Sequence, residues 1–250
     1  MRNDSRANVL GRAPRMRGAG AAFLTVLVFL LAGIQARAQS SQTLDDQYNE
    51  SVRDAAVYQH AHVLKLKPLT PNAGGKVTMV TLTSYPYKPG PTSLGVDVWT
   101  TIVPEVQDRC KRFPESTLKL DLQKLLGLPT TKNFTNFVVL IVDARDIFRP
   151  APDPSTNTEF PCSDPADPQC GNSFPSSATD AHKAWIAGQS LGSYQIPGGY
   201  PWTHLGYTYY WDHGGDIYGA SEYVVKKGST VEVTTVTPYQ DYCAGPKTGN

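Results

Sequence analysis

The chain has 250 residues, with 23 basic and 22 acidic side chains, and its first 38 residues hold six of the arginines and one acid. Residues 39–250 therefore carry 17 basic and 21 acidic side chains, a net charge of −4. This balance argues against a nucleic-acid-binding protein, because such proteins present a basic surface to phosphates. It also disfavours binding to anionic lipid.

Residues 21–34 (AAFLTVLVFLLAGI) are uncharged and mostly apolar, follow several arginines and precede Ala36-Arg37-Ala38. A membrane-spanning helix needs about 20 such residues, so this run is short. A basic start, an apolar centre and small residues at the exit predict a secretory signal peptide over residues 1–38, with either Met1 or Met16 as its start and cleavage after Ala38. We therefore expect a secreted or periplasmic protein without a stable membrane anchor in its mature form.

The four cysteines are even in number, as expected of an exported protein with disulfides, and they allow three pairings. Cys162 and Cys170 lie eight residues apart in a Pro-rich segment, which favours a bond between them. The remaining pair is then Cys110–Cys243. The chain-entropy model gives about 2.5 kcal/mol for the short loop and about 5 kcal/mol for the long one.

The first half of residues 39–250 contains both helix and strand patterns. Thr43 and Asp46 form an N-terminal cap that predicts a helix over 43–60. Alternating β-branched residues predict strands over 76–83 and 95–103, separated by a turn-rich stretch. Pro104 starts a short helix, and the apolar run 135–143 is the expected central strand.

Residues 150–180 are rich in Pro, Asp, Ser and Asn and hold no basic residue, which predicts a long acidic loop pinned by the small disulfide. A helix follows from Thr179 or Asp180 to about Gln189. Three strands are then expected over 203–211, 220–226 and 230–237, the last two as a hairpin around Lys227-Gly228. The order of elements indicates a single α+β domain over 39–250 with a mainly antiparallel β-sheet and a few short helices.

Residues 188–192 read G-x-S-x-G, the pattern that exposes a nucleophilic serine in α/β-hydrolases. A helical pattern precedes Ser190, where the hydrolase turn needs a strand, and no well-spaced acid and histidine follow it. The remaining candidates for chemistry are His204, Asp212 and His213, three groups of suitable type without a recognised spacing. The alternative interpretation is a helix that ends at Gly192.

Aromatic residues are concentrated in the last third of the chain, where they alternate along the strand expected over 203–211. Exposed aromatic rings bind sugars and other flat ligands, whereas buried ones form an ordinary core. The ligand-binding candidates are Trp202, Tyr207, Tyr209, Tyr210 and Trp211.

The acidic loop offers a calcium hypothesis, because Asp153, Asn157, Glu159 and Asp164 follow part of the spacing of an EF-hand loop. Thr158 stands where that loop requires Gly, so the pattern departs from the motif. The alternative is a solvated loop without metal.

Two functions remain open from the sequence. The first is a non-catalytic protein that binds a small molecule, a glycan or another protein through its aromatic C-terminal surface. The alternative is a small secreted hydrolase centred on Ser190, or on a metal-assisted or His/Asp site within residues 204–216.

Overall fold

The computed structural model describes residues 43–212 and 214–245, so the predicted signal peptide and His213 lie outside the described residues. The fold is α+β, as predicted. The main antiparallel sheet has seven strands in the order β2-β9-β4-β1-β3-β8-β5, and a second sheet pairs β6 with β7. The strands are β1 (Lys76–Thr83), β2 (Gly90–Ser93), β3 (Val98–Ile102), β4 (Asn136–Asp143), β5 (Ile147–Phe148), β6 (Tyr207–Tyr209), β7 (Tyr218–Ser221), β8 (Tyr223–Val225) and β9 (Thr230–Pro238).

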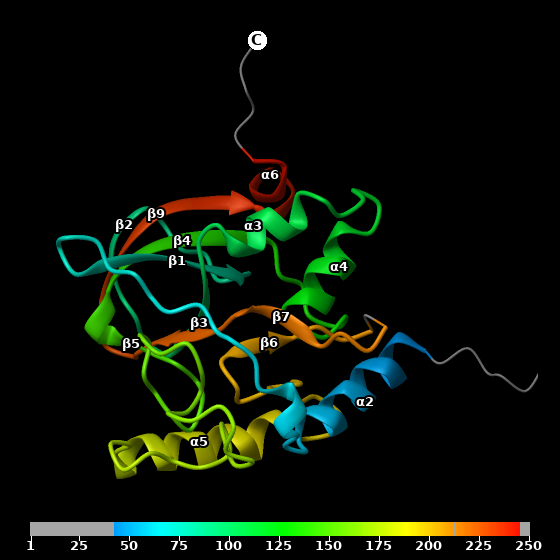
Figure 1. Ribbon diagram of the computed structural model, residues 1–250. Helices are drawn as coiled ribbons and strands as arrows, with labels where there is room; N and C mark the ends of the chain where they lie inside the picture. The colour runs from blue at the N-terminus through cyan, green and yellow to red at the C-terminus, as the bar shows by residue number, and fades with distance from the viewer. Residues whose placement is uncertain (1–42, 213, 246–250) are drawn as a thin grey trace, which may run out of the picture. The chain divides into compact units, whose positions relative to one another are not determined.

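Residues 43–212 and 214–245 contain five helices, which flank the sheets (Figure 1). They are α2 (Leu44–Ala55), α3 (Glu105–Cys110), α4 (Leu118–Leu125), α5 (Asp180–Ser193) and α6 (Tyr239–Ala244), with short 3-10 turns at His60–His62 and Ala144–Asp146. The predicted cap of α2 is present: the Asp46 amide donates to the Thr43 hydroxyl, and the Thr43 amide donates to the Asp46 carboxylate. None of the helices among the described residues is long and apolar enough to span a membrane.

The central strand pair of the main sheet is β1 and β4, which are antiparallel along their whole length from Lys76↔Asp143 to Thr83↔Asn136. Their side chains alternate between the two faces of the sheet, as the period-two pattern predicts. Met79 and Leu140 lie in one buried cluster, whereas Val80 and Phe137 lie in another on the opposite face.

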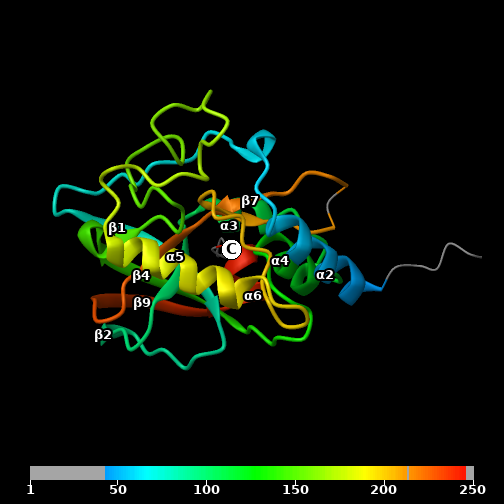
Figure 2. The same cartoon turned by 90° about the horizontal axis from the view of Figure 1, so that it is seen from below.

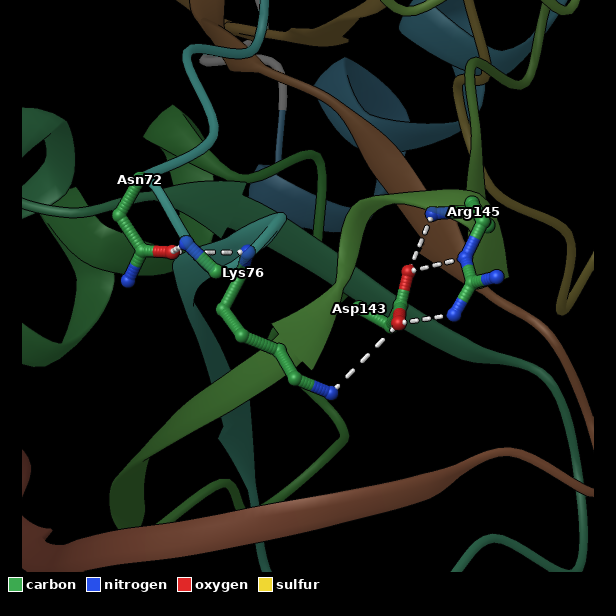
Figure 3. Close-up of polar contacts among 5 residues, drawn as sticks. Asn72, Lys76, Asp143 and Arg145 are labelled. Carbon is green, nitrogen blue, oxygen red and sulfur yellow. Dashed lines mark hydrogen bonds and ion pairs between the residues drawn. The ribbon is translucent and has the colours of Figure 1, made fainter.

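Polar contacts fix the open end of this strand pair (Figure 3). The Asn72 side-chain oxygen accepts hydrogen bonds from the amides of Gly74 and Lys76 and so orders the turn into β1. Asp143, at the end of β4, accepts bonds from the guanidinium and the amide of Arg145, and the Lys76 ammonium lies 3.6 Å from its carboxylate. These bonds lower the pKa of Asp143, with those from Arg145 as the main cause.

The strands β1 and β3 pair at only two positions, Met79↔Ile102 and Val80↔Thr101. The rest of β1, from Thr81 to Thr83, pairs with β4 on its other side. The rest of β3 pairs with β8 on its other side. The two strands therefore diverge after Val80 and leave a wedge in the sheet between them.

The hairpin predicted around Lys227-Gly228 is wrong, because β8 pairs with β3 and β5 whereas β9 pairs with β2 and β4. The backbone of Leu94, between β2 and β3, occupies the place of a hairpin partner. Its amide donates to the Ser229 carbonyl, and its carbonyl accepts from the Gly228 amide.

Strand β6 is shorter than the strand expected over 203–211 because the chain turns sharply just before it. The Thr203 hydroxyl donates to the Tyr207 carbonyl and accepts from the Leu205 amide, which closes the turn. His204 and Gly206 have positive φ values of 46° and 89°, outside the β region.

The structure contains both predicted disulfides. Cys110–Cys243 joins α3 to α6, and Cys162–Cys170 closes a short loop. The segment 149–179 holds no helix or strand, yet it is anchored by the side chain of Arg149, which is fully buried. The Arg149 guanidinium donates to the hydroxyl and the carbonyl of Thr158 and to the Tyr223 hydroxyl.

Candidate functional site

The wedge between β1 and β3 opens into a cavity of about 570 Å³. Its walls come from the second half of β1, the segment that links β2 to β3, the residues after α4, the end of α5 and the loop before β6. A volume of this size falls within the range typical of small-molecule sites. Figure 2 views the domain from the α5 side and shows this helix crossing the sheet.

Aromatic rings form much of the cavity wall. They are Tyr85, Tyr87, Trp99, Phe134, Phe137, Tyr200, Trp202 and Tyr209. Among them Tyr85 is 63% exposed and Tyr200 is 36% exposed, so the cavity reaches the protein surface beside these two side chains. Trp202 and Phe137 are buried and lie deeper.

Helix α5 is held beside the cavity by contacts of Trp185, within the helix, and of Tyr194, directly after it. The Trp185 indole donates a hydrogen bond of 2.8 Å to Asp97, in the segment that links β2 to β3, and its ring packs 5.9 Å from that of Trp99. At the end of the helix, the Tyr194 hydroxyl donates to the Trp202 carbonyl at 2.8 Å. These bonds fix the wall that α5 contributes through Gln189 and Ser193.

Glu222, between β7 and β8, places a carboxyl group at the cavity wall. Its Oε2 is shielded from solvent, and neither oxygen has a hydrogen-bond partner among the described residues. Burial raises the pKa of Glu222 to about 8 because the charged form loses its hydration and gains no compensating donor. A carboxyl group that has no hydrogen-bond donor among the described residues and stays mainly protonated at neutral pH is the unusual chemical feature of the cavity.

Tyr194, whose hydroxyl group senses the Glu222 charge, contacts a second titratable group, His204. Burial, and secondarily the Glu222 charge, raise the pKa of the Tyr194 hydroxyl. His204 lies within 3.3 Å of that hydroxyl through Nδ1, and burial lowers its pKa to about 4. Tyr194 and His204 are therefore uncharged near neutral pH.

The aromatic candidates predicted from the sequence divide into two groups. Trp202 and Tyr209 line the cavity, and the buried Trp202 Nε1 has no hydrogen-bond partner. Tyr207, Tyr210 and Trp211 are buried elsewhere: Trp211 is fully buried and its indole donates to the carbonyls of Gln123 and Leu128. These three rings pack in the core and are not among the cavity-lining residues.

No hydrogen bond joins Ser190, His204 and Asp212, the described candidates for hydrolase chemistry. The Ser190 hydroxyl donates to the Ile186 carbonyl within α5, where the G-x-S-x-G pattern lies inside a helix. His204 contacts Tyr194, and Asp212 forms a 2.8 Å ion pair with Lys124. His213 lies outside the described residues.

The calcium candidates are engaged separately within their loop. Asp153 and Asp164 accept hydrogen bonds from the nearby amides of Ser155 and Ala166, and Glu159 forms an ion pair with Lys65. Asn157 is exposed. Across residues 43–212 and 214–245, no three His, Cys, Asp or Glu side chains are grouped as metal ligands would be.

Sequence reasoning did not find the cavity, because its walls come from segments far apart in the chain. Trp99 and Thr101 alternate along a predicted strand and so face the same side, a pattern that partly indicates a shared wall. Glu222 is an acid inside an apolar strand pattern, between Ser221 and Tyr223, which is a weaker indication of a functional residue.

A comparison of the chain with models of known protein families, with curated proteins and with solved structures finds no match.

Proposed function

We propose that this protein is an exported binding protein for a small, mainly apolar molecule, which it holds in the cavity between β1 and β3. The observation that carries the proposal is the cavity itself: it has a volume of about 570 Å³, is lined by aromatic rings and is bordered by a helix fixed through hydrogen bonds. Sites for small molecules combine such apolar walls with a few polar groups.

Two residues of the cavity lining also carry buried polar atoms that the described part of the protein leaves without partners. Trp202 Nε1 and Glu222 Oε2 both lack partners, although leaving such groups unsatisfied costs about 1–3 kcal/mol each. Buried polar groups in folded proteins are nearly always paired.

Export is the second part of the proposal. It is supported by the basic and apolar pattern of residues 1–38 and by two disulfides, which persist in oxidising compartments. Mass spectrometry of the protein recovered from cells tests this part: an N-terminus at Gln39 supports it, and an intact N-terminus in the cytoplasm contradicts it.

The cavity proposal is tested with N-phenyl-1-naphthylamine, an uncharged aromatic probe whose fluorescence rises in apolar surroundings. The native protein is expected to bind it saturably at one site. Thr101→Phe should weaken binding at least about tenfold, because the larger side chain fills space at a lining position.

Thr235→Phe is the matched control, since Thr235 is an exposed strand residue outside the cavity lining. It should bind the probe as the native protein does. Thermal unfolding of each variant establishes that it is folded. A native protein that does not bind the probe, or equal affinities for the native and Thr101→Phe proteins, would overturn the proposal.

A further inference from the structure

The charged residues that line the cavity are all acidic. They are Asp97 and Glu222, and none of the lining residues within the described part of the chain is Lys, Arg or His. The cavity therefore offers negative charge, or groups able to acquire it, and no positive charge to a ligand. An anionic ligand would find no cationic side chain in this lining to balance its charge.

The two carboxyl groups differ in what already contacts them. Asp97 accepts hydrogen bonds on both oxygens, from the Trp185 indole at 2.8 Å and from the Lys227 amide at 2.7 Å. Glu222 accepts none among the described residues. Asp97 thus serves to hold α5 and the β8–β9 turn, whereas the Glu222 carboxyl group is committed to no other element of the described chain.

Two indole rings of the same cavity wall also favour a cation. Trp99 and Trp202 both line the cavity, with their ring centroids 6.1 Å apart and their planes nearly perpendicular. The face of an indole ring attracts a positive charge, and this attraction increases when water is excluded. Two indole rings and an unpartnered carboxyl group in the wall of one cavity favour an ammonium group as its ligand.

We propose that the ligand of this cavity is an organic amine, in which an apolar body lies against the aromatic wall and the charged ammonium group binds Glu222. The inference rests on the proposed function and names the ligand class of the same site. It assigns to Glu222 the role of counter-charge and to Trp99 and Trp202 the role of aromatic wall.

Amine binding is then coupled to loss of a proton. In the free protein, burial holds the pKa of Glu222 at about 8, so the group is largely protonated at neutral pH. The bound ammonium stabilises the carboxylate, and the carboxyl proton passes to solvent. Of the neighbouring groups, Tyr194 and His204 stay neutral between pH 6 and 8, and Asp97 is bonded to its two donors.

The test uses three naphthalene probes of similar size that differ in charge: 1-naphthalenemethylamine, 1-naphthalenemethanol and 1-naphthoate. Each displaces N-phenyl-1-naphthylamine from the native protein and from Glu222→Gln. In the native protein the amine should bind at least about tenfold more tightly than the alcohol, as a charged hydrogen bond in a shielded site predicts. Glu222→Gln should remove that preference.

Glu232→Gln is the matched control, because Glu232 is exposed on β9 and does not line the cavity. It should keep the amine preference of the native protein. Equal affinities of the native protein for the amine and the alcohol, or a preference that survives in Glu222→Gln, would overturn this inference. The proposed function would still stand in either case if the uncharged reporter binds, and it would fail only if the reporter does not.

Calorimetry measures the number of protons released on binding. This number would not change if Glu222 had only a structural role. Binding of the amine to the native protein should release protons at pH 7 and become tighter as the pH rises from about 6 to about 8. The alcohol should show neither effect. Proton release that is the same for both compounds, or absent for both, would also refute the inference.

Discussion

Cys110 and Cys243 are bonded across 133 residues and join the helix that follows β3 to the helix that follows β9. Both are nearly fully buried in the core cluster that contains Val106 and Phe137. The second disulfide, Cys162–Cys170, closes only eight residues in a surface loop. The two bonds therefore make unequal contributions to the stability of the fold.

Replacing both cysteines of the long pair by Ser should lower the free energy of unfolding by about 5 kcal/mol, because the unfolded chain gains the freedom of a large loop. The corresponding double variant of the short pair should lose about 2.5 kcal/mol. Urea unfolding of the oxidised proteins measures both values. Equal losses would contradict the loop-size argument.

Gly206→Ala should destabilise the protein by about 2 to 4 kcal/mol. Gly206 has a φ of 89°, and an added Cβ would lie 2.6 Å from Cδ of the buried Arg149. Gly95→Ala is the control, since nothing lies within 4 Å of its added Cβ and its φ is not positive. Thermal unfolding of both variants checks the prediction; a neutral Gly206→Ala would show that Arg149 can move.

Asp143→Asn should destabilise the protein near neutral pH, and the difference should shrink as the pH falls. The folded-state pKa of Asp143 is lowered, chiefly by the hydrogen bonds from Arg145. Its stabilising contribution is therefore present above the unfolded pKa, near about 4, and is lost as the pH falls through the folded pKa. Unfolding free energies measured from pH 7 downward provide the test, and a pH-independent difference would count against it.

Glu222→Gln should have the opposite pH dependence. The pKa of Glu222 is raised to about 8 in the folded state, so unfolding releases a proton between its ordinary pKa, near about 4.5, and that value. The native protein loses stability as the pH rises through this window, and the glutamine variant does not. The variant should therefore become progressively more stable than the native protein from pH 5 to pH 8. A constant difference in melting temperature would argue against a buried carboxyl group.

Ser190→Ala should leave binding of the uncharged probe unchanged and shift the unfolding free energy by less than about 0.5 kcal/mol. The Ser190 hydroxyl donates to the Ile186 carbonyl within the same helix, and alanine has the higher helix propensity. An esterase activity of the native protein that disappears in this variant would instead favour the hydrolase alternative.

Local patterns predicted much of the fold. The alternation in residues 76–83 and 135–143 indicated β1 and β4 within one residue, and the Thr43 cap indicated the start of α2. The pairing of β8 and β9 failed because partner choice depends on distant segments. Leu94, more than 130 residues away, takes the place that a hairpin partner would occupy.

The site was less accessible to sequence reasoning. Tyr207 and Trp211 belong to the predicted aromatic cluster but pack in the core, and only Trp202 and Tyr209 of the five named aromatics line the cavity. The cavity exists because β1 and β3 diverge after two paired positions. No property of either strand alone encodes that divergence, since it is set by their packing against β4 and β8.

That divergence also bears on how selective the protein is for ligand size. Beyond Val80 and Thr101 no pairing between β1 and β3 spans the wedge. A small increase in the width of the wedge therefore disturbs side-chain packing but breaks no hydrogen bonds between these two strands. Affinity across a series of ligands of increasing girth should therefore decline gradually, without the abrupt limit that a fully bonded wall would impose.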